Sequence, residues 1–184
     1  EASNNKVSLS NGTTFTGNLY AGYTEDGNAT GNEVSLSDVT APQYVYASYT
    51  TEGQAGGTVT LSNGSVTNNV YGGFTHDGVA DGSKVTGTNS KVGGSIYGGQ
   101  GTTGASSNTV DLDNVQVTGS VSGGYTDSGD ASDNAVTLSN GTTFTGDLYA
   151  GYTENGNATG NALTLSEITA PGSVRAGYTQ SSPD

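Results

Sequence analysis

Residues 6–42 read KVSLSNGTTFTGNLYAGYTEDGNATGNEVSLSDVTAP, and residues 135–171 read AVTLSNGTTFTGDLYAGYTENGNATGNALTLSEITAP. The two stretches align without a gap, and a shorter repeat lies within their offset. An aromatic motif, LYAGYT at residues 19–24 and VYGGFT at residues 70–75, recurs every 25 to 27 residues. The equivalents of its first Tyr are Tyr20, Tyr46, Tyr71, Tyr97, Ser122, Tyr149 and Arg175. Fixed repetition of this kind predicts a stack of seven equivalent units.

Each unit is expected to contain two strands. In the stretch VTLS at residues 136–139, Val136 and Leu138 alternate with hydroxyl residues, which is typical of a half-buried strand. Three apolar columns result: Val7, Val34, Val59, Val85, Val110, Val136, Leu163; Leu9, Leu36, Leu61, Gly87, Leu112, Leu138, Leu165; and Leu19, Val45, Val70, Ile96, Val121, Leu148, Val174. A polar column is expected to form turns: Asn11, Asp38, Asn63, Asn89, Asn114, Asn140 and Glu167.

The composition makes stacking necessary. Leu, Ile, Val and Phe total only 30 of 184 residues, Gly totals 31, and the net charge is −13. A unit so poor in apolar residues buries them only between neighbours above and below. We therefore expect an all-β fold, a single-stranded parallel β-helix or β-solenoid of about seven coils of 25 to 27 residues, with a right-handed coil. Residues 1–184 then form one β-solenoid domain, or a segment of a longer repeat array.

Two columns of small or polar residues are expected to be structural. Asparagine is expected to pass amide hydrogen bonds along the stack, while a row of asparagines that binds a ligand is the open alternative. Its members are Asn5, Asn32, Asn108, Asn134 and Asn161, with Gly57 and Ser83 completing the column. The glycine column is expected to mark a sharp bend or a close backbone approach. It comprises Gly22, Gly73, Gly99, Gly124, Gly151 and Gly177, with Ser48 in the second unit.

Aromatic residues flank the glycine column on both sides. Beside the column that begins at Tyr20 runs a second column, whose exposed rings are candidates for partner binding: Tyr23, Tyr49, Phe74, Tyr125, Tyr152 and Tyr178. The alternative is that at least one of the two columns packs inward. If the next row, of threonines, points outward, it can order water, and ice binding is then a possible function. The row comprises Thr24, Thr50, Thr75, Thr126, Thr153 and Thr179.

Charge and residue inventory exclude several function classes. With four Lys and Arg residues against 17 Asp and Glu residues, the chain should repel nucleic acid and anionic bilayers. Neither Cys nor Met occurs, and no apolar stretch approaches the length of a membrane span. His76 is the only histidine and Arg175 the only arginine, so we expect no enzyme. The one weak metal candidate is calcium at Asp127, Asp130 and Asp133, against the alternative of solvated surface turns; otherwise no cofactor is expected.

The phrases GNEVSLS at residues 31–37 and VYGGFT at residues 70–75 resemble the repeats of bacterial autotransporter passenger regions and related surface adhesins. This resemblance extends over all seven units and carries no catalytic signature. It implies an extracellular, non-catalytic stalk or adhesin whose partner is a protein or a glycan at a cell surface. Two alternatives remain open: a filament of copies joined end to end through uncapped coils, and a carbohydrate-binding β-helix.

Overall fold

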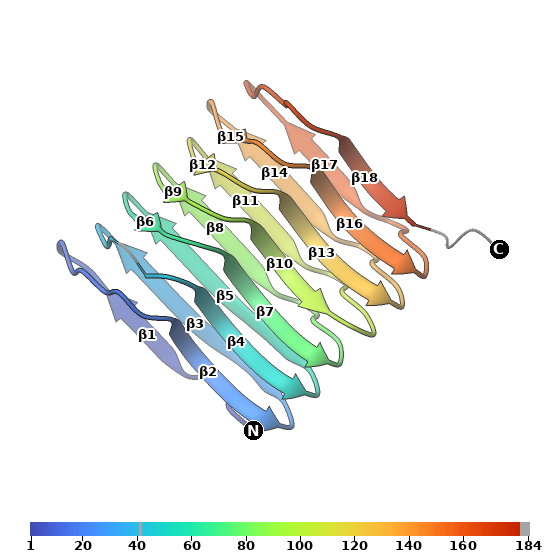
Figure 1. The fold of residues 1–184 in the computed structure, drawn as a ribbon, viewed down its shortest axis with the longest axis horizontal. Helices are drawn as coiled ribbons and strands as arrows, with labels where there is room; N and C mark the ends of the chain where they lie inside the picture. The colour runs from blue at the N-terminus through green and yellow to red at the C-terminus, as the bar shows by residue number, and fades with distance from the viewer. Residues whose placement is uncertain (41, 181–184) are drawn as a thin grey trace.

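Seven coils of parallel strands build the whole fold. A computed structural model describes residues 1–40 and 42–180, and every regular element in this part of the chain is a β-strand. The coils stack along one axis from the N-terminus, blue in Figure 1, to the C-terminal coil, red in Figure 1. The predicted β-solenoid with a repeat of about 26 residues is therefore confirmed.

Two long sheets and one short sheet form the sides of the coils. The first sheet, in spatial order, is β1 (Lys6–Leu9), β3 (Ala29–Ser37), β5 (Ala55–Ser62), β8 (Lys84–Thr88), β11 (Thr109–Asp113), β14 (Ala135–Ser139) and β17 (Ala162–Leu165). The second sheet is β2 (Leu19–Asp26), β4 (Val45–Glu52), β7 (Val70–Asp77), β10 (Ile96–Gly101), β13 (Val121–Ser128), β16 (Leu148–Asn155) and β18 (Val174–Thr179). The short sheet is β6 (Ser65–Val66), β9 (Lys91–Val92), β12 (Gln116–Val117) and β15 (Thr143–Phe144).

Strand register places equivalent residues of neighbouring coils beside one another. In the first sheet Val7 pairs with Val34, and Leu9 pairs with Leu36. In the second sheet Tyr20 pairs with Tyr46, which pairs in turn with Tyr71. Adjacent parallel strands lie about 4.8 Å apart, so each column in the sequence becomes a continuous row of side chains along the solenoid.

The three apolar columns lie between the sheets, and their apolar members other than Leu165 and Val174 belong to one continuous hydrophobic cluster or pack against it. Val34, Val59 and Val110 are fully buried, because each lies between valines of the two neighbouring coils. Gly87 breaks the leucine column, but its neighbours close the gap. A β-carbon at Gly87 would lie 3.0 Å from the Leu112 side chain and 3.1 Å from that of Val115, so the core is continuous at this coil as well.

Each coil turns a corner through one residue with left-handed backbone geometry. The predicted turn column adopts this conformation in every coil, with φ between 48° and 58°: Asn11, Asp38, Asn63, Asn89, Asn114, Asn140 and Glu167. Asn and Asp tolerate this region because their short side chains bond to nearby backbone groups. This turn prediction is confirmed.

Candidate functional site

The second sheet carries both aromatic columns on its outer face because the strand alternation is interrupted once in each coil. In β4, Val45, Ala47 and Ser48 are all fully buried, and the ladder of paired residues skips Ala47. Two successive residues therefore point inward, and Tyr46 and Tyr49 both point outward on either side of them. Two neighbouring side chains that both point inward, such as those of Ala47 and Ser48, have room only if both are small. This accounts for the adjacent columns of Gly, Ala and Ser.

Rings of the first column stack face to face along the solenoid. The centroids of Tyr20 and Tyr46 lie 4.9 Å apart with 4° between the ring planes. Tyr46 and Tyr71 follow at 4.7 Å and 2°, then Tyr71 and Tyr97 at 5.1 Å and 6°. Ser122 interrupts this column before Tyr149, so the continuous run has four rings.

The second column stacks in the same way and touches the first edge to face. Tyr23 and Tyr49 lie 5.2 Å apart at 12°, and Tyr125 and Tyr152 lie 4.6 Å apart at 3°. Within one coil the columns meet at nearly a right angle, as Tyr46 and Tyr49 do at 5.4 Å and 90°. Both columns therefore belong to one outer surface, which we call the aromatic face, and the alternative that one column packs inward is wrong.

Stacking determines what the aromatic face offers to a partner. A ring that lies parallel to its neighbours at less than 5.5 Å has both faces covered, so it presents only its edge and hydroxyl group to solvent. Sugars stack on ring faces, which are free only at the end of a column or beside a gap. Tyr23, at the first coil, is the most exposed ring, with 51% of its surface accessible. Carbohydrate stacking is therefore restricted to a few positions.

Burial within the columns raises the pKa of several phenols at the centre of the face. Burial raises the pKa of Tyr71 to about 12, partly offset by the hydrogen bond that Asn69 Nδ2 donates to its hydroxyl at 2.7 Å. Burial likewise raises the pKa of Tyr46 and of Tyr125, reinforced by neighbouring tyrosines. The centre of the aromatic face is thus uncharged over the ordinary pH range.

Beneath the aromatic face, the asparagine column forms a buried ladder of hydrogen bonds. Asn134 Oδ1 accepts from the backbone N–H of Asn108 at 2.9 Å, and its amide nitrogen donates to the carbonyl of Ala105 at 2.9 Å. Asn161 repeats both contacts one coil later, with Asn134 and Ala131. The inner asparagines Asn32, Asn108 and Asn134 are at most 1% exposed. They bond to the protein itself, so the geometry does not support a ligand-binding role for them.

The glycine column makes room for this ladder. A β-carbon at Gly124 would lie 2.6 Å from the Asn134 amide nitrogen, and one at Gly22 would lie 2.1 Å from that of Asn32. Such distances are far below van der Waals contact, so glycine is needed wherever the facing residue is asparagine. The same contact joins Gly99 to Asn108 and Gly151 to Asn161. Gly177 differs, because its close neighbour is Ala158.

Where the glycine column changes, the asparagine column changes with it. In the second coil Ser48 replaces glycine, and the facing residue is Gly57 instead of asparagine. Ser48 Oγ accepts from Asn32 Nδ2 and donates to the carbonyl of Gly56, both at 2.9 Å, so the hydroxyl takes over part of the ladder. In the next coil Ser83 faces Gly73, and its hydroxyl is buried without a hydrogen-bond partner.

The threonine row points inward, so the alternative of an outward threonine array is wrong. Thr50, Thr126 and Thr153 are completely buried. Their hydroxyls donate to backbone carbonyls of the turns, for example Thr50 to Gly27 and Thr153 to Gly129, both at 2.8 Å. These bonds satisfy carbonyls at the corner that returns the chain to the first sheet.

The aspartates suggested for calcium are not assembled into a ligand set. Among residues 1–40 and 42–180, no three His, Asp or Glu side chains are grouped so that they could hold a metal ion. Asp130 Oδ1 instead accepts from the backbone and side-chain nitrogens of Asn157, at 3.0 and 3.1 Å. Asp133 holds a left-handed turn, and Asp127 lies on the rim of the aromatic face. Calcium binding stays an untested prediction.

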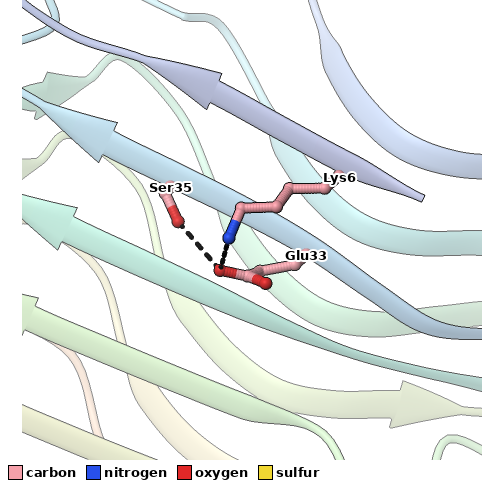
Figure 2. Close-up of polar contacts among 3 residues, drawn as sticks. All are labelled: Lys6, Glu33 and Ser35. Carbon is pink, nitrogen blue, oxygen red and sulfur yellow. Dashed lines mark hydrogen bonds and ion pairs between the residues drawn. The ribbon is translucent and has the colours of Figure 1, made fainter. Parts of the chain in front are cut away.

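The outer face of the first sheet is hydroxyl-rich and carries the one ion pair of the described residues. Lys6 Nζ lies 2.9 Å from Glu33 Oε1, which also accepts a hydrogen bond from Ser35 at 3.2 Å (Figure 2). Hydrogen bonds from Lys6 and Ser35 lower the pKa of the Glu33 carboxyl. Both side chains of the pair are well exposed, so solvent screens their attraction.

Comparison with known proteins adds no relative. No family model matches the chain, and neither a curated protein nor a solved structure matches it. Among the described residues there is also no helix with the length and hydrophobicity needed to cross a membrane.

Proposed function

We propose that this chain is a non-catalytic structural and adhesive module displayed outside the cell. In this role it is a stiff acidic solenoid that holds a protein or a glycan against its aromatic face. The observation that carries the proposal is the pair of stacked aromatic columns on one side of the second sheet. This surface presents rows of ring edges and hydroxyl groups, with Tyr23 the most accessible ring at 51%. Tyrosine is enriched at protein interfaces because it offers an apolar body and a polar tip. The likeness of the repeats to autotransporter passengers supports the extracellular location.

Stiffness follows from the same arrangement. Every inner coil is hydrogen-bonded to two neighbours through both long sheets, and the short sheet, the asparagine ladder and the stacked rings add contacts over parts of the stack. Bending the solenoid requires all of these rows to open on one side together. A stalk that carries an adhesive surface away from a cell needs this property.

Two measurements test the proposal. Antibody raised against the chain should label intact source cells, and labelling that appears only after permeabilisation would contradict an extracellular role. Beads coated with the chain should be retained under flow on a printed glycan panel or on immobilised gelatin more than on albumin. Replacing Tyr23 and Tyr49 by Gln should reduce retention, because Gln already occupies this column at Gln100 and preserves the fold. The matched control replaces Thr58 and Thr60 on the first sheet by Gln.

A filament is the second candidate, and one observation favours it. The last coil exposes apolar side chains that are buried at the equivalent positions of inner coils: Leu165 and Val174 are each 38% accessible, whereas Leu138 and Leu148 are fully buried. A further coil stacked on this one, supplied by a second copy or by additional repeats, would cover them. Sedimentation velocity at increasing protein concentration should then show growing species, whereas a single concentration-independent species would refute end-to-end assembly.

A further inference from the structure

One gap in the second aromatic column forms a notch on the aromatic face. Gln100 pairs with Phe74 on one side and with Tyr125 on the other, so it occupies the place where the column would have a ring. Phe74 and Tyr125 lie two coils apart, at about 9.6 Å by strand spacing. A cavity of about 110 Å³ opens beside Gln100, lined by Phe74, His76, Thr102 and Asp127 among others.

The notch combines a ring face with negative charge. The Phe74 ring stacks on Tyr49 at 5.2 Å on one face, and no ring of the described residues stacks on its face toward Gln100. The His76 ring meets Phe74 edge to face at 5.8 Å and 89°, at the border of the same cavity. Asp127 supplies a carboxylate at the rim and is exposed to solvent. Burial is the largest cause of the raised pKa of Tyr125, and the negative charges of Glu154 and Asp127 add to it. Both carboxylates therefore lie near the second column. The whole chain carries a net charge of −13 and attracts cationic partners.

The last coil shows which cation this surface accommodates. Arg175 takes the place of a ring in the first aromatic column, paired with Tyr149. Its guanidinium carbon lies 4.7 Å from the ring centroid of Tyr178 and 6.0 Å from that of Tyr149. The Tyr149 hydroxyl in turn donates to Asp147 at 3.0 Å. A guanidinium thus substitutes for a missing ring next to a tyrosine and an aspartate.

We propose that the notch at Gln100 binds an arginine side chain of a partner protein, with the guanidinium against Phe74 and its charge balanced by Asp127. A guanidinium is flat, so it fits a gap left by one ring, and it stacks on aromatic faces while pairing with carboxylates. An ammonium group is compact and strongly hydrated, and it suits a flat gap less well. This inference rests on the proposed function in one respect, that the aromatic face is the contact surface, and it names the partner chemistry there.

The test is titration of the isotope-labelled chain with three short peptides that differ only at one residue: arginine, lysine or citrulline. Backbone amide signals of Gln100, Thr102 and Asp127 should shift with the arginine peptide. Because the stacking and ion-pair contributions are modest at an exposed site, citrulline should bind about tenfold more weakly. Equal binding of arginine and citrulline, no binding of the arginine peptide, or stronger shifts of the same signals by a glucose oligomer would each overturn the proposal.

Three variants locate the site. Gln100→Tyr completes the column with the residue found in neighbouring coils, so the fold is retained and binding should fall at least tenfold. Asp127→Asn should weaken binding about threefold. Glu154→Gln removes the equivalent charge one coil further on, outside the notch, and should change affinity by less than a factor of two. Equal loss from the last two variants would point to unspecific attraction and refute the site. If beads coated with the unmodified chain are not retained but the arginine peptide still binds, only the adhesive function is refuted.

Discussion

Replacing Asn134 by Ala should destabilise the solenoid far more than the same change at Asn5. The Asn134 side chain satisfies the N–H of Asn108 and the carbonyl of Ala105, both buried inside the coil stack. Removing it leaves two buried backbone groups without partners, at about 1–3 kcal/mol each, so the free energy of unfolding should fall by about 2–6 kcal/mol. Asn5 is exposed and loses a single side-chain bond, to Asn32. Its loss should cost less than about 1 kcal/mol.

Urea unfolding followed by the circular-dichroism signal of the sheet measures the difference. With a urea dependence of about 2 kcal/mol per molar for a protein of this size, Asn134→Ala should lower the midpoint by about 1–3 M. Asn5→Ala should lower it by less than about 0.5 M. Both variants replace Asn by Ala in the same column, so the difference in intrinsic strand propensity between the two residue types is the same in each and cancels in the comparison. Equal midpoints for the two variants would refute the claim that the inner ladder bonds stabilise the stack.

The other predictions concern buried hydroxyls and the tyrosine columns. Ser48→Ala should lower the free energy of unfolding in urea by about 1–3 kcal/mol, because the Ser48 hydroxyl bonds to two groups. Ser83→Ala should leave it unchanged or raise it, since this change removes an unpaired buried hydroxyl. The reverse order would contradict the assigned contacts. In a pH titration followed by phenolate absorbance, a late class of tyrosines that includes Tyr71 should ionise near pH 12. The pKa of Tyr71 is raised on folding from about 10, so its contribution to stability is complete below about pH 10 and is lost as the pH rises through 12. Ionisation of all 11 tyrosines near pH 10 with the sheet signal intact would count against the stacked columns.

The sequence predicts the coil and its register because both are periodic. Val7, Val34 and Val59 share a position in the repeat, and in a parallel stack equal positions are necessarily neighbours. The turn column is equally readable, since an Asn-Gly pair such as Asn63-Gly64 favours left-handed geometry from local chemistry alone.

Strict alternation of inward and outward residues gives the wrong face for the side chains that follow the glycine column in each strand. The two inward residues at Ala47 and Ser48 shift the alternation by one, which moves Tyr49 outward and Thr50 inward. The glycine column indicates an irregularity at this position, but the residue count does not show that the alternation changes phase there. Strict alternation by itself would place the threonine row on the outer face, whereas Thr50 is buried.

The contact between asparagine and glycine is nonlocal, since it joins the two long sheets across the interior. One signal in the sequence points to it: glycine gives way to Ser48, and the next member of the asparagine column along the chain is Gly57 instead of asparagine. Paired changes of this kind indicate that two columns touch. The notch at Gln100 has no comparable signal, because a missing ring defines a site only once the rings on both sides are known to stack.

Disulfide trapping tests most directly whether residues one coil apart lie side by side. The chain has no cysteine, so two introduced thiols report only on each other. Thr60 and Thr86 are register partners with outward side chains, and Ser35 lies in the same column one coil before Thr60. We expect cysteines at Thr60 and Thr86 to form an intramolecular disulfide on mild oxidation, since their α-carbons are about 4.8 Å apart. Cysteines at Ser35 and Thr86, about 9.6 Å apart, should keep free thiols. Free thiols in the first pair, or equal crosslinking of both pairs, would contradict the stacked coil.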